Sequence, residues 1–374
     1  MLKSENTAYP LYVKLTMILI SIIAITYISV IIKEVLSPLL FGLLFSILLL
    51  PAAGFFETKL KFSRSGASAV SVLLLLLSIV AVMLLLGSQI TKLAQDLPLL
   101  QEQVNTSLHG IQKWISTKMH INIDKQMAYI QTATTNIKAV SPSVIGSTFL
   151  SLSSILLFLV FVILDTFFML LYRRRLLKFL VDIFDKEYTA TVYDIVSTSQ
   201  NIIRKYVVGL FLQMSTVAAV CCTVFLMLGI KYAILLGLIT AIFNIVPYIG
   251  IFSALLLNVL ITFATTAVAG KVILVIITVV VMHLVDSNIL LPVIVGSKVK
   301  INAFITLLGV VLGEMIWGIS GMFLSIPVIA ILKIIFDRIE TLQPWGHLLG
   351  DEKFVKKKII VTAENKPLEE DTVL

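Results

Sequence analysis

Residues 272–296 read VILVIITVVVMHLVDSNILLPVIVG, an apolar segment of membrane-spanning length in which His283, Asp286 and Asn288 are embedded. Polar groups at bilayer depth cost several kcal/mol unless they face protein or water, so such residues are candidates for function. Pro292 follows closely, and a proline inside a helix predicts a break or a kink. Membrane transporters build binding sites from broken helices of this kind. The segment therefore predicts a membrane transport protein.

The composition of the whole chain supports a membrane protein. Its 374 residues are 59% hydrophobic and 13% charged, and the mean hydropathy is +1.04. Soluble domains carry roughly 25% charged and 45–50% apolar residues, so lipid must surround most of this chain. The net charge of +8 fits basic cytoplasmic loops, which hold membrane proteins in their orientation, and we expect no nucleic-acid partner.

Because a spanning helix needs about 20 apolar residues, the sequence predicts an all-α polytopic protein with about eight transmembrane helices: 15–32, 35–53, 67–88, 150–172, 206–229, 232–262, 272–295 and 303–335. No small-residue cleavage site follows the first run, so we expect a retained helix. The sixth and eighth spans are long for a single crossing, which leaves tilted, kinked and re-entrant arrangements open.

These spans define an organisation in six parts. Transmembrane helices 1–3 occupy 1–88, helix 4 occupies 149–172 and helices 5–8 occupy 206–340. Between them lie an extracytoplasmic helical hairpin insert at 89–148 and an amphipathic cytoplasmic segment at 173–205, and a cytoplasmic tail covers 341–374. The insert has a coiled-coil-like apolar seam, which suits either two helices packing on each other or an oligomer contact. The basic, amphipathic segment suits a helix that lies along the membrane surface.

Lysine and arginine residues near the span ends predict the orientation, because cytoplasmic loops are enriched in them. With both termini cytoplasmic, most of these residues fall on the cytoplasmic side: Lys59, Lys61, Arg64, Arg173, Arg174, Arg175, Lys178, Arg204, Lys205, Lys271, Lys333 and Arg338. Lys298 and Lys300 are exceptions.

Two motifs place polar residues beside Pro and Gly in successive spans. The first contains Asn244, Pro247, Tyr248 and Gly250. Pro247 would break the sixth span, and the amide of Asn244 and the hydroxyl of Tyr248 would contact a polar solute. Such a kink also occurs in membrane helices for structural reasons alone.

The second motif runs from Asn288 through Pro292 to Gly296 in the seventh span. The two motifs together suggest paired broken helices around a site near the middle of the membrane. His283 and Asp286 precede the second motif on one helical face. This pair suits either a proton relay or a hydrogen bond that fastens two helices together.

Asp165 and Glu314 are further acidic residues inside predicted spans. With Asp286 they are the candidates for an ion or proton site, because intramembrane carboxylates commonly mark ion pathways.

No catalytic, phosphate-binding or metal-ligand motif occurs in the chain. We therefore expect no enzyme, no cofactor and no metal, and any transport would be secondary or passive.

Several stretches resemble the autoinducer-2 exporter family, also described as PerM-like permeases. They are YVVGLFLQ at 206–213, LGL at 236–238, PYIG at 247–250, NILLPVIVG at 288–296 and GISGMFLSIP at 318–327. The resemblance covers essentially the whole chain. It implies a multi-pass protein of the bacterial inner membrane and a homo-oligomer.

The residues and the resemblance together predict a permease that exports a small polar solute, with autoinducer-2, a quorum-sensing molecule, as the solute implied by the family. One alternative is a sodium(lithium)/proton antiporter, which would carry a monovalent cation. A second alternative is a membrane scaffold that docks a partner without transport.

Overall fold

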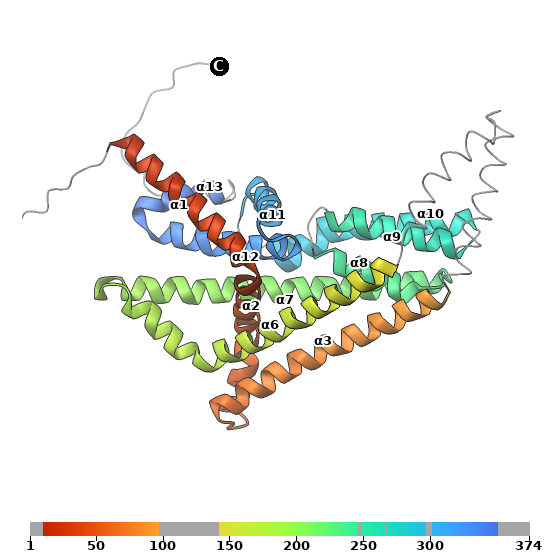
Figure 1. Ribbon diagram of the computed structural model, residues 1–374, viewed down its shortest axis with the longest axis horizontal. Helices are drawn as coiled ribbons and strands as arrows, with labels where there is room; N and C mark the ends of the chain where they lie inside the picture. Colours follow the sequence, from red (N-terminus) through yellow and green to blue (C-terminus); the bar gives the residue numbers. More distant parts are fainter. Residues whose placement is uncertain (1–9, 97–141, 246–248, 267, 297–300, 351–374) are drawn as a thin grey trace, which may run out of the picture.

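The computed structural model describes residues 10–96, 142–245, 249–266, 268–296 and 301–350, which form helices joined by short turns (Figure 1). The described residues contain no β-strand and one isolated bridge, Ile301–Gly350. Six of their segments are long and apolar enough to cross a membrane. These are α2 (Lys33–Thr58), α3 (Arg64–Gln95), Ser153–Asp182 of α6 (Pro142–Asp182), Lys186–Met227 with α7 (Thr189–Met227), Ala269–Leu290 with α10 (Ala269–Val285), and α12 (Ile319–Arg338). The prediction of an all-α polytopic membrane protein is confirmed.

Helix α1 (Leu11–Ile31) stands largely apart from the other helices. Most of its large apolar side chains are more than half exposed, as expected for a helix surrounded by lipid. It lies on the side of the molecule opposite α3 (Figure 1). The indole nitrogen of Trp317 donates a hydrogen bond to the carbonyl of Ser29, 3.0 Å away, and so ties the end of α1 to the C-terminal helices.

The predicted amphipathic segment 173–205 does not form a helix of its own. It is divided between the end of α6, the short 3-10 helix η1 (Lys186–Tyr188) and the first half of α7. No proline or glycine interrupts residues 189–208, so α7 continues without a break into its apolar part. Most of the predicted insert, residues 97–141, lies outside the described residues, and α3 extends through its first residues to Gln95.

The sixth predicted span is two antiparallel helices, α8 (Ala233–Phe243) and α9 (Ile249–Thr265). The Asn258 amide nitrogen donates to the Thr240 hydroxyl at 2.9 Å. In one straight helix these residues would stand about 27 Å apart, so the chain must reverse between them. The reversal needs a glycine, because a Cβ on Gly250 would lie 1.7 Å from the Phe243 carbonyl oxygen.

The eighth predicted span is also a hairpin, formed by α11 (Ala303–Trp317) and α12. Gly318 has a φ of +65° at the turn, in the left-handed region that favours glycine. The two helices approach closely, since a Cβ on Gly321 would lie 1.9 Å from the carbonyl oxygen of Gly313. Apolar content alone cannot distinguish such a hairpin from one long helix, because both are continuous in hydropathy.

Helix α8 is too short to cross a bilayer. Its 11 residues span about 16 Å, roughly half of a hydrocarbon core of about 30 Å. Helix α8 therefore cannot complete a crossing by itself, and the turn that follows it places Asn244 against Asp286.

Helix α7 runs through the centre of the bundle and contributes to two apolar cores. One joins Ile203, Tyr206 and Val207 to α2 and α12, through Leu44, Ile47 and Leu324. The other joins Val217, Cys221 and Phe225 to α8 and α10, through Leu235, Leu236, Val275 and Val279. Gln213 lies on α7 between these two cores and is buried.

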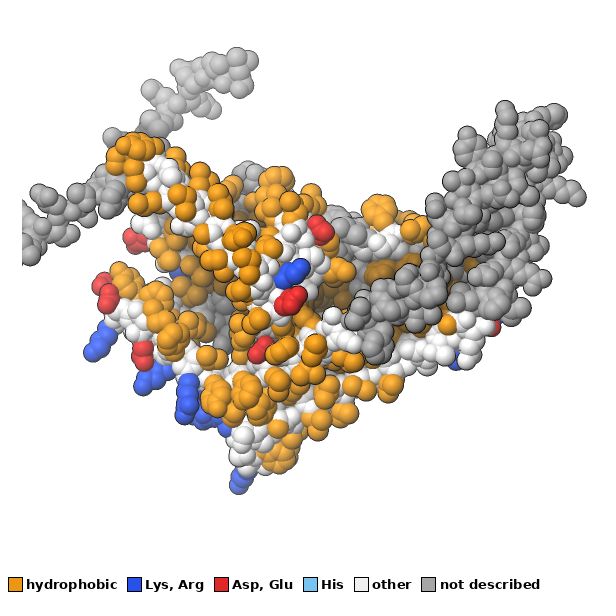
Figure 2. All heavy atoms as spheres, in the orientation of Figure 1, with side chains coloured by type: hydrophobic (Ala, Val, Ile, Leu, Met, Phe, Trp, Pro, Cys, Tyr) orange, Lys and Arg blue, Asp and Glu red, His pale blue; other side chains and the backbone are white. Residues whose placement is uncertain are grey.

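The two ends of the bundle differ in charge. Lysine and arginine side chains gather where α6 meets α7 and where α2 meets α3, whereas the rest of the visible face is mostly hydrophobic (Figure 2). At this basic end Arg173 pairs with Glu57 at 2.7 Å, and Arg338 pairs with Asp194 at 2.5 Å. The chain then closes with η3 (Glu340–Leu342) and α13 (Gln343–Leu349).

The opposite end carries the C-terminus of α3 and the turn between α7 and α8. There Asp96 pairs with Lys231 at 2.7 Å, and the Lys271 ammonium donates to the Gly229 carbonyl at 2.9 Å. Lys271 was predicted to share a side with the basic end, and that prediction is wrong. The α8–α9 hairpin adds a reversal of the chain, which returns the start of α10 to the end where α7 finished.

The α11–α12 contact predicts opposite effects for the same substitution at two glycines. Gly321→Ala should lower the free energy of unfolding by ~1–3 kcal/mol, because the added methyl group must push the two helices apart. Gly87→Ala in α3 meets nothing within 4 Å and should raise it by ~0.5–1 kcal/mol through helix propensity. Thermal unfolding of the purified proteins in detergent measures both changes. Equal changes in the free energy of unfolding for Gly321→Ala and Gly87→Ala would contradict the close approach of α11 and α12.

Candidate transport site

A buried carboxylate joins three helices near the middle of α7. The Gln213 amide nitrogen donates to both oxygens of Asp286, at 2.8 and 2.9 Å. The Asn244 amide nitrogen, at the end of α8, donates to one of them at 2.9 Å. Asp286 is 5% exposed and Gln213 is 2% exposed. Two predicted residues, Asn244 and Asp286, thus meet directly, and Gln213, which the motif analysis did not select, binds the same carboxylate.

The helix that carries Asp286 changes type at that residue. Helix α10 ends at Val285, and the π-helix η2 continues from Asp286 to Gly296. Pro292 lacks the N–H that an α-helix would use, and a π-helix is a known way to absorb such a defect at functional sites. The predicted break at Pro292 is therefore a widened turn, while the backbone continues as a helix.

A small cavity adjoins the carboxylate. It is lined by Val217, Thr240, Asn244, Ile251, Ala254, Val279, Met282, His283 and Asp286, from α7, α8, α9, α10 and η2. Its volume for water-sized spheres is about 10 Å³, which is close to the minimum for one water molecule. The site is thus closed to any larger solute in this conformation.

The polar groups around the cavity form an acceptor-rich cluster. No lysine, arginine or histidine among the described residues forms an ion pair with Asp286. Gln213 Oε1 and His283 Nδ1 are buried without a hydrogen-bond partner among the described residues. Asn258 Oδ1 and Thr262 Oγ1 share this property further along α9. Since buried polar atoms are rarely left unpaired, this region suits a polar molecule that donates hydrogen bonds.

His283 and Asp286 line the same cavity, but no hydrogen bond joins their side chains. The two side chains thus do not bond to each other, and Asp286 instead binds Gln213 on α7 and Asn244 at the end of α8. Asn288 is exposed, and its amide donates to the Leu284 carbonyl of its own helix at 2.8 Å, so it lies outside the cluster. Pro247 and Tyr248 lie outside the described residues.

The other predicted acidic residues are placed elsewhere. Asp165 on α6 packs against α2, where a Cβ on Gly42 would lie 2.6 Å from the Asp165 Cβ. Glu314 is exposed on α11. Neither residue lines the cavity beside Asp286, so the structure does not bring the three carboxylates together.

Three residues that join this cluster escaped the motif analysis, namely Gln213, Thr240 and Asn258. Gln213 ends the YVVGLFLQ stretch and occupies a position on the buried face of α7. A polar residue on an otherwise apolar helical face was the available signal. Thr240 and Asn258 carry no such signal, because their contact depends on the α8–α9 reversal.

A second cavity, of about 360 Å³, opens at the Asp96 end. Its walls come from α3, α7 and α8: Gln89, Lys92, Gln95, Asp96, Leu226, Lys231, Tyr232, Ala233 and Ile234. Hydrogen bonds from Lys231 and then from the Tyr232 hydroxyl lower the pKa of Asp96 below its ordinary value. The ion pair and the hydrogen bond join the end of α3 to the start of α8.

The fold and the buried polar cluster define a class, the multi-pass helical membrane transporters. The chain belongs to the AI-2E transporter family, since the model of that family, "AI-2E family transporter", matches residues 18–341.

Two relatives come from Bacillus subtilis (strain 168). The "Putative transport protein YueF" is 25% identical over 257 residues, which cover 67% of this chain and 69% of the relative. The "Putative transport protein YrrI" is 36% identical over 110 residues, which cover 29% of this chain and 31% of the relative. These descriptions support a transporter. They name no coupling ion, so the antiporter alternative finds no support in them.

The Asp286 cluster predicts a large cost for removing Gln213. Gln213→Leu should lower the free energy of unfolding by at least ~1–3 kcal/mol, because it leaves a buried carboxylate without two of its hydrogen bonds. Ser215→Ala, at an exposed position of α7, should change it by less than ~0.5 kcal/mol. Denaturation of both variants in detergent compares them. A Gln213→Leu protein as stable as the wild type would show that Asp286 is not held by this residue.

The Asp96 contact predicts a pH dependence of stability. A carboxyl group with a lowered folded pKa stabilises the fold above its unfolded pKa of about 3.9, and this contribution disappears as the pH falls through the folded pKa. Asp96→Asn should therefore lower the unfolding midpoint at pH 7, and its difference from the wild type should begin to shrink below about pH 4 and disappear as the pH falls through the lower folded pKa of Asp96. Thermal unfolding between pH 7 and pH 3 tests this expectation. Asp185→Asn, at an exposed aspartate with no ion pair to a described residue, is the control and should follow the wild type throughout.

Proposed function

We propose that this protein is a secondary transporter that exports a small polar solute through the region around Asp286. The observation that carries the proposal is the buried carboxylate of Asp286, which binds Asn244 at the end of α8, a helix too short to cross the membrane alone. A buried carboxyl group without a cationic partner among the described residues is costly, and such residues in membrane helices commonly mark transport pathways. The chain lacks a phosphate-binding loop, so the energy would come from a gradient.

The acceptor-rich cluster favours a solute with several hydroxyl or amine donors. Asp286 and Gln213 Oε1 offer acceptor positions close together, and an ionised carboxylate forms the stronger hydrogen bonds. Autoinducer-2 is the solute that the family resemblance suggests, and it is the first to be tested.

Solute passage requires the α8–α9 hairpin to move, because the cavity holds about one water molecule. The hairpin touches the cluster through Asn244 and the cavity through Ile251 and Ala254. Opening it would break the Asn244–Asp286 hydrogen bond and leave Gln213 on α7 as the fixed partner of Asp286. Movement of a discontinuous helical element around a fixed site is a common form of alternating access.

We place the basic end of the bundle in the cytoplasm of a bacterial cell, with the protein in the inner membrane and both termini cytoplasmic. Arg64, Arg173, Arg175 and Arg338 at this end support the orientation through the positive-inside rule. The second cavity, beside Asp96, would then face the opposite side, toward which export proceeds. We also propose that the protein forms a homo-oligomer, and this proposal rests on the family resemblance alone.

Two variants within η2 test the pathway with a matched control. Asp286→Asn keeps an oxygen acceptor but removes the charge, so we expect export to fall by ~10- to 100-fold, the equivalent of losing one or two charged hydrogen bonds. Asn288→Ala changes an exposed side chain two positions away and should leave export unchanged. Release of autoinducer-2 from liposomes containing each purified protein provides the measurement.

The amount of protein and its unfolding midpoint are checked for both variants. Export by Asp286→Asn at the wild-type rate would remove the carboxylate from the pathway. The wild type could instead fail to export autoinducer-2 but export another hydroxylated solute, with that export depending on Asp286. This result would support the proposed site and show that its solute is not autoinducer-2.

A further inference from the structure

A third cavity lies at the basic end of the bundle, between α3 and α6. It has a volume of about 320 Å³ and is lined by Arg64, Ser65, Leu171, Tyr172 and Arg175. One arginine comes from the first turn of α3 and the other from α6, so the folded chain brings two separate cationic groups to one opening. Figure 2 shows lysine and arginine side chains gathered at this end.

The positive charges of Arg64 and Arg175 are not neutralised by the described carboxylates. Glu57, a nearby carboxylate, is already engaged, because both of its oxygens accept hydrogen bonds from Arg173 at 2.7 Å. No carboxylate among the described residues forms an ion pair with Arg64 or Arg175. The cavity therefore has a net positive wall.

Tyr172 holds one of these charges at the cavity. The guanidinium carbon of Arg175 lies 5.5 Å from the centroid of the Tyr172 ring. Stacking on an aromatic ring positions a guanidinium group while its N–H donors stay free for a planar or tetrahedral anion. The Ser65 hydroxyl adds a neutral donor on the opposite wall.

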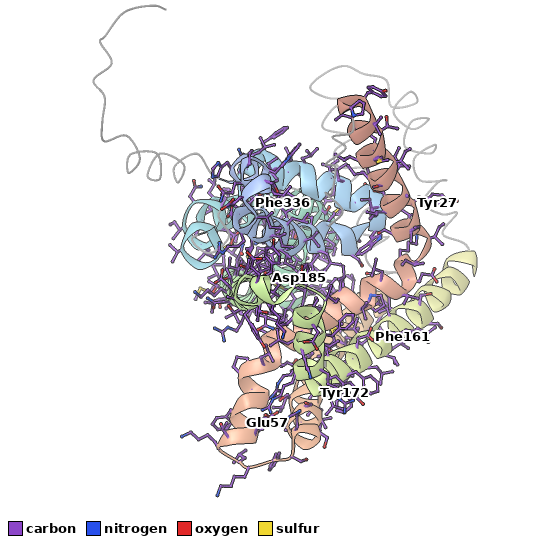
Figure 3. All side chains as sticks on the ribbon, turned by 90° about the vertical axis from the view of Figure 1, so that its left-hand side faces the viewer. Tyr27, Glu57, Phe161, Tyr172, Asp185 and Phe336 are labelled. Atoms are coloured by element: carbon purple, nitrogen blue, oxygen red, sulfur yellow. The ribbon has the colours of Figure 1, made fainter. Side chains whose placement is uncertain are left out.

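An apolar stripe leads from the cavity along α6. Phe161, Leu164, Phe168 and Tyr172 are spaced by three, four and four residues, so they share one helical face. Their side chains are 53%, 46%, 47% and 42% exposed. Figure 3 shows Phe161 and Tyr172 along α6, with Glu57 of α2 near the Tyr172 end.

The length of this stripe matches one leaflet of a bilayer. Tyr172 lies eleven positions after Phe161 in the helix, which corresponds to about 16 Å. Half of a hydrocarbon core of about 30 Å is about 15 Å. The basic cavity thus stands where a lipid headgroup would lie when acyl chains follow the stripe.

We propose that the cavity between Arg64 and Arg175 binds the headgroup phosphate of an anionic phospholipid, whose acyl chains pack along Phe161, Leu164 and Phe168. Basic pockets beside transmembrane helices on the cytoplasmic side are suited to such headgroups. Two uncompensated arginines favour a lipid with net negative charge, such as phosphatidylglycerol or cardiolipin. A zwitterionic headgroup would place its own ammonium group among these cations.

The test measures the thermal unfolding midpoint of the purified full-length protein in detergent as dioleoyl phosphatidylglycerol is added. The Arg64→Gln, Arg175→Gln double variant should need at least ~10-fold more lipid for half of the stabilisation, since it loses two charge-assisted contacts. The Arg174→Gln, Arg204→Gln double variant removes the same charge from exposed positions outside the cavity. It should respond to the lipid as the wild type does. Arg175→Lys keeps the charge but loses the planar stacking group, so its half-effect concentration should fall between those of the wild type and the double variant.

Two further additions separate a lipid from a free anion. Dioleoyl phosphatidylcholine and soluble glycerol phosphate should each stabilise the wild type far less than phosphatidylglycerol. Equal stabilisation by glycerol phosphate would make the cavity a site for free anions and overturn the lipid proposal. Stabilisation by phosphatidylcholine equal to that by phosphatidylglycerol would show that the arginines do not select the headgroup, and would also overturn the lipid proposal. The same conclusion would follow if both double variants lost the response to phosphatidylglycerol to the same extent.

Discussion

The carboxylate of Asp286 is the constraint to which the neighbouring helices adapt. It is buried, and its hydrogen bonds come from Gln213 on α7 and Asn244 at the end of α8. A buried carboxylate needs such donors, because it has lost the hydration that water would supply. The π-helix that starts at Asp286 and the early end of α8 at Phe243 both serve to present these groups.

The two hairpins give the bundle its local architecture around α7. The α8–α9 hairpin packs beside the second apolar core of α7, and the α11–α12 hairpin packs beside the first. Gln213 lies between these cores, so the polar cluster is enclosed by apolar packing along the helix on both sides. Low exposure strengthens the hydrogen bonds of the cluster and makes any unpaired group there costly.

Sequence analysis predicted much of this correctly because hydropathy and charge are local properties. The all-α membrane class followed from the long apolar runs, and Asp286 and Asn244 were selected as polar residues within them. The reversals near Gly250 and at Gly318 were left open beside tilted and kinked spans, since proline and glycine inside an apolar run signal a kink as readily as a turn. The side of Lys271 was wrong for the same reason, because each missed reversal inverts the direction of all following helices.

Composition and short-range periodicity are enough to show that this chain is a helical membrane protein and to identify the polar residues within its apolar segments. Which of these polar residues contact one another follows from the packing of the helices. Gln213 joins Asp286 across 73 positions of the chain, and Asn288, two residues from Asp286, faces away. Side-chain partnership depends on how helices pack and where the chain reverses, and neither is encoded in the spacing of a single segment.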